Sequence, residues 1–242
     1  MMDRNSNAYT FIFAIAMVIV VAVTLSFTAT SLNPLQKENV RKEKMQNILS
    51  TIGIQTSRDE AEELFNKHVT QQYALDHTGQ EKEGINAFQV DLAKELAKPV
   101  EEQTFPLYLA NYEGQEFYIA PLRGSGLWDA IWGYIALKDD ANTVKGVVFD
   151  HKGETAGLGA EITTDWFQQR FVDEKIFDEE GNLVGVSVVK GYSGGNNKDD
   201  NQVDSISGAT ITGDGVTAML SKRLKNYLPF FKKRQEIKVV TR

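Results

Sequence analysis

The fold is decided by the stretch Leu107-Tyr108-Leu109-Ala110-Asn111-Tyr112, followed by the pair Glu113-Gly114 and by residues 115–122. Two runs rich in apolar and aromatic residues flank a two-residue turn that ends in glycine, which is the pattern of a β-hairpin. Residues 131–137 and 143–149, joined by a polar linker, predict a second hairpin. Consecutive hairpins indicate an antiparallel sheet at the centre of the domain.

Helical patterns surround these hairpins. After residue 213, apolar residues at core spacing predict an amphipathic helix through residue 228. Earlier in the chain, residues 161–171 are expected to form a helix with one aromatic side, made of Trp166, Phe167 and Phe171. The expected helices are residues 35–54, 58–73, 85–98 (ended by Pro99) and 161–171, with a further strand at 183–190.

The N-terminus carries one segment that suits a membrane. Tyr9 to Phe27 contains no charged residue, and at about 1.5 Å rise per residue it reaches roughly 28 Å, close to the hydrocarbon thickness of a bilayer. A cleaved signal peptide is the alternative, but its apolar core is usually shorter, and Phe27 fits poorly three positions before a cut after Ala29. We therefore expect a retained transmembrane anchor.

The predicted fold class is α+β: a single N-terminal transmembrane helix followed by a mixed domain built on an antiparallel sheet with flanking helices. We expect an anchor at 1–30, a helical stalk or insert at 31–105, the main domain at 106–228 and a basic tail at 229–242. The aromatic and basic residues 230–234 suit a membrane-surface or partner-docking contact or, as we expect, a solvated end.

Composition narrows the function. A net charge of −7 leaves no broad basic face, which argues against a nucleic-acid partner. The absence of cysteine excludes a thiolate-held iron–sulfur cluster and a catalytic thiol. His68, His77 and His151 do not recur at a metal-ligand spacing, so no metal site is expected. No catalytic residues are expected either, because Ser207 lacks the glycine two positions before it that a nucleophile elbow requires.

The segment Asp204-Ser205-Ile206-Ser207-Gly208-Ala209-Thr210 places a hydroxyl among small side chains, just before a predicted helix. Gly208 and Ala209 leave the backbone open, so a large group can approach Thr210. A group on Thr210 would lie near unpaired N–H donors and the positive end of a helix dipole, an environment that favours phosphate. On spacing alone the signal is weak, because Ser/Gly/Thr turns before helices are mostly simple helix caps.

This segment resembles the flavin-attachment motif of the FMN-binding domain family. Two further stretches, Gly124-Ser125-Gly126-Leu127-Trp128 and residues 151–162, agree with it in order and spacing, with Ala156 where a proline is common. The arrangement is similar to that of the C-subunit family of the sodium-translocating NADH:quinone reductases (the Nqr complex). In that family a flavin transferase that uses FAD esterifies the threonine with the phosphate of FMN, so the resemblance implies covalent FMN at Thr210.

The resemblance also implies which residues hold the flavin. Leu127 and Trp128 suit the faces of the ring, and backbone groups of residues 154–159 suit its pyrimidine edge. Asp204 either positions the segment for the transferase or caps the turn. The expected cofactor-binding residues are Thr210, Asp204, Ser207, Gly208, Ala209, Leu127, Trp128, Glu154, Thr155, Gly157, Leu158 and Gly159.

The implied function is an electron relay between other redox subunits of a sodium-pumping NADH:quinone oxidoreductase. The implied partners are other membrane subunits of that complex, the flavin transferase during maturation, and membrane lipid. Sodium translocation would belong to the assembly, since one span without internal charge builds no ion path. The alternatives are the G subunit of an Rnf-type ferredoxin:NAD oxidoreductase, a membrane-anchored flavin-bearing sensor or regulatory module, and an anchored assembly protein without cofactor.

Two arguments conflict on the side of the membrane. Only Arg4 precedes the span, and four basic residues follow it, so the positive-inside rule places the domain in the cytoplasm. Those four residues are Lys37, Arg41, Lys42 and Lys44. The resemblance implies the opposite, a bacterial inner-membrane protein with its domain on the periplasmic side, and we follow the resemblance.

Overall fold

A computed structural model describes residues 6–240 of the chain, with side chains described as far as residue 234. The chain divides into two compact units, Met1–Lys44 and Met45–Arg242. The helix α1 (Asn7–Thr51) supplies most of the first unit and its last residues belong to the second.

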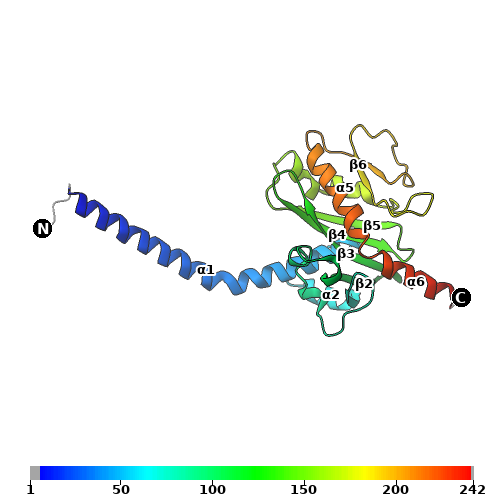
Figure 1. Cartoon of the computed structure of the whole chain (residues 1–242), viewed down its shortest axis with the longest axis horizontal. Helices are drawn as coiled ribbons and strands as arrows, with labels where there is room; N and C mark the ends of the chain where they lie inside the picture. The colour runs from blue at the N-terminus through cyan, green and yellow to red at the C-terminus, as the bar shows by residue number, and fades with distance from the viewer. Residues whose placement is uncertain (1–5, 241–242) are drawn as a thin grey trace. The chain divides into compact units, whose positions relative to one another are not determined.

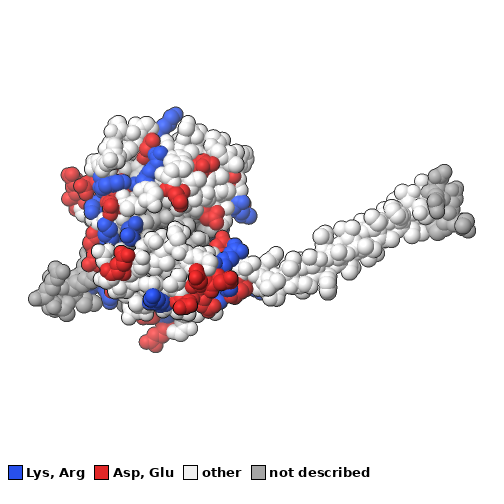
Figure 2. All heavy atoms as spheres, turned by 180° about the vertical axis from the view of Figure 1, so that it is seen from behind, with Lys and Arg blue, Asp and Glu red and all other residues white. Residues whose placement is uncertain are grey.

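Among the described residues, α1 is the one helix long and apolar enough to cross a membrane, with a mean hydropathy of 2.6 over its most apolar window. Its apolar side chains, from Phe11 to Phe27, are exposed, and Figure 2 shows no charged residue along this part of the helix. Because apolar side chains exposed over such a length are unfavourable in water, the observation agrees with the predicted anchor.

The second unit is built on a five-stranded antiparallel sheet of order β1-β2-β3-β4-β5 (Figure 1). The strands are β1 (Val69–Leu75), β2 (Phe105–Tyr112), β3 (Gln115–Ser125), β4 (Ala130–Lys138) and β5 (Val144–His151). Glu113 (φ 53°) and Gly114 (φ 76°) both take the left-handed conformation that a tight hairpin turn requires. Both predicted hairpins and the predicted fold class are confirmed.

The two faces of the sheet bury different side chains because successive residues of a strand point to opposite sides. In β3, Phe117 and Ile119 pack with the end of α1 and with α2 (Ala61–His68). Tyr118 and Leu122 pack on the other face, against α5 (Thr210–Leu224). That second face also carries the short helices η3 (Gly159–Thr163), α4 (Asp165–Gln168) and η4 (Gln169–Phe171).

The helices expected before the sheet are shorter than predicted. The expected helix at 58–73 ends at His68, because Val69 onward pairs with β2 as an edge strand, and sheet pairing outweighs helical periodicity. The expected helix at 85–98 breaks into η1 (Ala87–Gln89) and α3 (Leu92–Glu95), followed by η2 (Val100–Glu102). Asn86 and Asp91 each cap a new helix start, which interrupts the continuous helix.

The elements after the sheet also differ from prediction. Residues 161–171 form three short helices in which Phe167 and Phe171 are fully buried but Trp166 is 47% exposed, so the prediction of one aromatic face was wrong for Trp166. The expected strand at 183–190 shrinks to β6 (Ser187–Val189), which pairs in parallel with β7 (Gln202–Asp204).

The C-terminal helix begins a second time after a short break. The helix α5 starts at Thr210, four residues earlier than expected, and α6 (Leu228–Val240) follows it. Phe231 is only 2% exposed and Phe230 packs on the ring of Tyr73, with centroids 5.3 Å apart. The expectation of a solvated end was therefore wrong for these two side chains, which close the core.

Candidate functional site

Three segments that are distant in sequence meet around a hollow of about 220 Å³. They are the turn after β3, the loop after β5, and the segment that leads into α5. The residues that line the hollow are Leu127, Glu154, Thr155, Leu158, Gly159, Gly208, Ala209, Thr210, Ile211 and Thr212.

Thr210 is the first residue of α5 and its side chain is exposed. The N-cap residue Ala209 provides no side-chain cap, and the first turn holds no acidic residue. The first backbone N–H groups of the helix therefore lie beside Thr210 without a carboxylate of that turn competing for them. Gly208 adopts φ +76°, a left-handed conformation that favours glycine, and a Cβ at that position would lie 2.8 Å from Leu158 Cδ2, so a larger residue would also displace the Leu158 side chain.

Glu154 joins the three segments from one side of the hollow. Its side chain is 7% exposed, and its two oxygens accept from Thr212 Oγ1 at 2.6 Å and from Trp128 N at 3.0 Å. Burial alone would raise the pKa of Glu154, but these hydrogen bonds and one from the Asp129 amide outweigh it and hold the pKa below its ordinary value. The carboxylate is therefore a charged, buried tie rather than a proton donor at neutral pH.

Gly159 makes this tie possible. A Cβ on Gly159 would fall on Glu154 Oε2 and on Thr212 Oγ1, so any larger residue would separate the two. His151 Nδ1 accepts from the Glu154 backbone N–H at 3.0 Å, which caps the turn before Glu154.

The rim of the hollow is apolar and exposed. Leu127 is 46% exposed, Leu158 40% and Ile211 57%. Trp128 is 69% exposed, and its indole N–H donates to Thr155 Oγ1 at 3.2 Å, which holds the ring beside the hollow. Such a group of apolar side chains on the surface of a domain marks a binding site more often than a solvated face.

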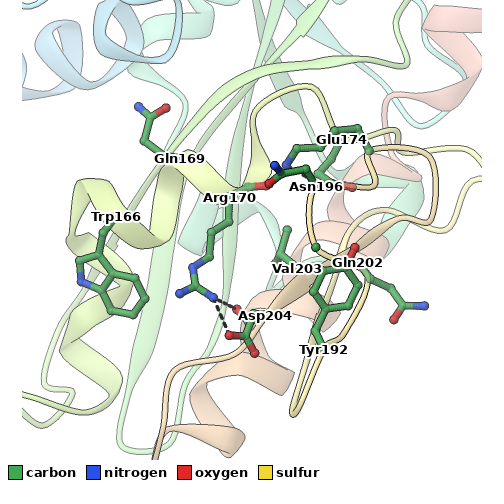
Figure 3. Close-up of a pocket in the computed structure, with 11 residues that line it drawn as sticks. Trp166, Gln169, Arg170, Glu174, Tyr192, Asn196, Gln202, Val203 and Asp204 are labelled. Carbon is green, nitrogen blue, oxygen red and sulfur yellow. Dashed lines mark hydrogen bonds and ion pairs between the residues drawn. The ribbon is translucent and has the colours of Figure 1, made fainter.

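Asp204 lies elsewhere, on the rim of a second hollow of about 390 Å³ (Figure 3). Its carboxylate pairs with Arg170, with Nη1 and Oδ2 3.1 Å apart. Two other expected residues also lie outside the lining of the first hollow. Ser207 is exposed in the segment before Thr210. Gly157 lies in a turn, and its backbone N–H donates to Glu161 Oε1 at 3.0 Å. The structure thus brings together most of the expected residues, but it separates Asp204 from them.

Three residues around these two hollows were not predicted from the sequence. Ile211 and Thr212 follow Thr210 directly, so a helix start at Thr210 would have placed both in the first turn beside the hollow. Arg170 gave no signal, because its partner Asp204 is 34 residues away and no periodicity connects them.

The fold and the site define a class of protein. A family model described as the FMN-binding domain matches residues 126–225, a range that contains all three segments around the hollow. This part of the chain thus matches the FMN-binding domain, and a helix able to span a membrane precedes it in the sequence.

Similar proteins show to which family of FMN-binding domain proteins the chain is related. The C subunit of the Na(+)-translocating NADH-quinone reductase of Haemophilus ducreyi is 33% identical over 204 residues, which cover 78% of this chain and 78% of that protein. The C subunit of the same enzyme from Pseudomonas aeruginosa is 30% identical over 241 residues, covering 91% of this chain and 92% of that protein. The crystal structure of the C subunit from Parabacteroides distasonis is 40% identical, with a TM-score of 0.75, and covers 83% of this chain and 96% of that one.

The chain belongs to the C-subunit family of the Na(+)-translocating NADH-quinone reductases. It is accordingly a membrane-anchored subunit of an ion-translocating oxidoreductase complex, with the other subunits of that complex as partners. We assign the chain to this family and not to the Rnf-type alternative, because the match extends over nearly the full length of the Pseudomonas C subunit.

Proposed function

We propose that the chain carries FMN on Thr210 through a phosphoester and relays electrons between the redox subunits of its complex. The single observation that supports this most is the position of Thr210: an exposed hydroxyl at an uncapped helix N-terminus, on the rim of an apolar hollow. A phosphodiester there would carry about one negative charge, which helix N–H groups stabilise.

The residues around the hollow fit FMN. The phosphate would lie at the N-terminus of α5, and the ring would lie against the exposed side chains of Leu127, Trp128 and Leu158. When bound, FMN supplies the redox chemistry that no side chain of this cysteine-free chain provides. The protein's own groups bind and orient: Glu154 keeps Thr212 and the 127–128 turn in place, and the apolar rim excludes water from the ring.

The proposed attachment involves a second protein. A flavin transferase would deliver FMN from FAD, and the Thr210 hydroxyl would be the acceptor. Lipid would surround the apolar part of α1.

We also propose that the domain lies on the periplasmic side of the inner membrane, as the resemblance implies. The basic residues after the span argue the other way, and the pairing of Arg41 with Glu38 through two hydrogen bonds of 2.9 Å does not remove that argument, because acidic residues count little in the positive-inside rule. Arg4, the one basic residue before the span, lies outside the described residues. A C-terminal reporter enzyme that is active only in the cytoplasm would contradict the proposed orientation.

The mass of the whole protein tests the attachment. The full chain is co-expressed with a flavin transferase, and we expect an added mass equal to FMN less water. Thr210→Ala should abolish the added mass, Thr210→Ser should retain it because the hydroxyl remains, and Thr163→Ala, an exposed threonine outside the hollow, should leave it unchanged. An unmodified wild-type chain would refute covalent attachment, and a full adduct on Thr210→Ala would refute the site.

A further inference from the structure

A second network of charged side chains holds the start of the segment that leads to Thr210. Arg170 Nη1 donates to the backbone oxygen of Asp204 at 3.0 Å and pairs with its carboxylate at 3.1 Å. The guanidinium carbon also lies 4.7 Å from the ring centroid of Trp166 (Figure 3). These three contacts fix the guanidinium in one orientation.

The backbone of Arg170 is held as well. Lys198 Nζ donates to the Arg170 carbonyl oxygen at 2.7 Å and to Glu174 Oε1 at 2.9 Å. The Glu174 side chain is only 1% exposed and that of Lys198 is 35% exposed, so this contact is partly buried and holds Lys198 in place. A shift of the Arg170 backbone would therefore break this partly buried hydrogen bond.

Asp204 needs such support because its strand is minimal. The strand β7 has three residues and pairs with one neighbour, β6, on one side. On its other side, Arg170 supplies the donor to the Asp204 carbonyl that a further strand would otherwise provide.

The segment after Asp204 is short and anchored at both ends. Ser205 N donates to Val189 O at 3.1 Å at one end, and α5 begins at Thr210 at the other. Between them Ile206 and Ala209 are buried while Ser207 and Gly208 are exposed. Only residues 205–209 separate Asp204 from Thr210, and the buried side chains of Ile206 and Ala209 join this turn to the core, so a displacement at Asp204 would shift the turn together with Thr210.

We propose that Arg170 is a positioning residue for the attachment of FMN, acting through Asp204 to present the Thr210 hydroxyl. This inference rests on the proposed function. In the attachment step the Thr210 Oγ1–phosphorus bond forms, the bond between the two phosphates of FAD breaks, AMP leaves, and the hydroxyl proton is released. Arg170 touches none of these atoms, so its effect is on the placement of the acceptor.

The test compares Arg170 with a matched ion pair. Lys138 pairs with Asp173 at 2.7 Å, at similar exposure, and neither residue lines the second hollow. Full-length wild type, Arg170→Ala, Arg170→Lys and Lys138→Ala are purified in detergent without flavin and incubated with transferase and FAD. The adduct is followed by whole-protein mass to give kcat and KM for the chain, and thermal unfolding is recorded for each.

Misplacement of a reacting group costs up to about a hundredfold in rate, and we expect Arg170→Ala to lower kcat by about tenfold to a hundredfold at nearly unchanged KM. Arg170→Lys should restore part of the rate because it keeps the charge opposite Asp204, and Lys138→Ala should match wild type at a similar unfolding temperature. A wild-type kcat in Arg170→Ala, or an equal loss in Lys138→Ala, overturns the inference. An unmodified wild-type chain overturns the proposed function first and the inference with it.

Discussion

Glu154 is the residue on which the geometry of the site depends most. One buried carboxylate contacts the helix that carries Thr210, through Thr212, and the turn that carries Leu127 and Trp128. Hydrogen bonds to a charged group stabilise a fold more than neutral ones, about 1.5–3 kcal/mol against about 0.5–1.5 kcal/mol. The loss of this charge would therefore be felt in the stability of the whole site.

Stability should depend on the charge of Glu154 below neutral pH. Because its pKa in the folded protein is below the ordinary value of 4.5, the charged form stabilises the fold above about pH 4.5, and this contribution is lost as the pH falls through the folded pKa. Replacing Glu154 with Gln should therefore lower the free energy of unfolding by about 1 kcal/mol at pH 7, with a difference from wild type that shrinks toward pH 3. Urea unfolding at several pH values measures this, and a pH-independent difference would contradict it.

Gly159 should tolerate no side chain. A methyl group at this position would collide with Glu154 and Thr212, so Gly159→Ala should cost about 1–3 kcal/mol of stability. Gly153 lies in the same loop, and a Cβ there meets no atom within 4 Å, so Gly153→Ala is the matched control and should be close to neutral. Equal thermal unfolding of the two variants would show that the close contact at Gly159 does not matter.

At the scale of elements, the junction between α5 and α6 closes the core over the sheet. Tyr227, which lies between the two helices, is 1% exposed, and its hydroxyl lies 3.1 Å from Pro106 O and 3.3 Å from Pro121 O. The two prolines belong to adjacent strands β2 and β3, so one side chain connects the C-terminal helices to the centre of the sheet.

Tyr227→Phe should destabilise the domain without moving the helices. The variant leaves the two buried carbonyls without a shared donor, at a cost of about 0.5–1.5 kcal/mol. Tyr112 is half-buried against His68 at the sheet's other end and serves as the control, since Tyr112→Phe removes a hydroxyl away from these carbonyls. The free energy of unfolding of each variant measures the effect. A Tyr227→Phe variant as stable as the wild type would contradict the prediction.

At the scale of the whole molecule, the two ends of α1 lie in different environments. Its N-terminal part is exposed and apolar, whereas Met45, Ile48 and Leu49 near its C-terminus are buried in the second unit, together with Ile52 just after it. Burying one such side chain stabilises a fold by about 1.5–3 kcal/mol, and the four together are comparable with the total stability of a domain, about 5–15 kcal/mol.

Truncation should separate these two roles. A chain that begins at Glu38 keeps all four buried side chains and should fold as a water-soluble domain. A chain that begins at Thr56 loses them and should be largely unfolded. Circular dichroism with thermal unfolding checks both, and a cooperative transition of equal midpoint in the shorter chain would contradict the buried role of the helix end.

The sequence by itself determined the elements whose signals are local. Apolar runs and the Glu113-Gly114 turn predicted the hairpins, uncharged length predicted the apolar part of α1, and the resemblance of three short motifs predicted an FMN-binding domain. Tertiary structure alone decided the contacts between distant residues. Glu154 meets Thr212 across 58 residues and Arg170 meets Asp204 across 34, and the strand β1 exists because β2 lies beside it. Such pairs leave no periodic pattern in the chain, because their partners become neighbours only once the sheet and helices have packed.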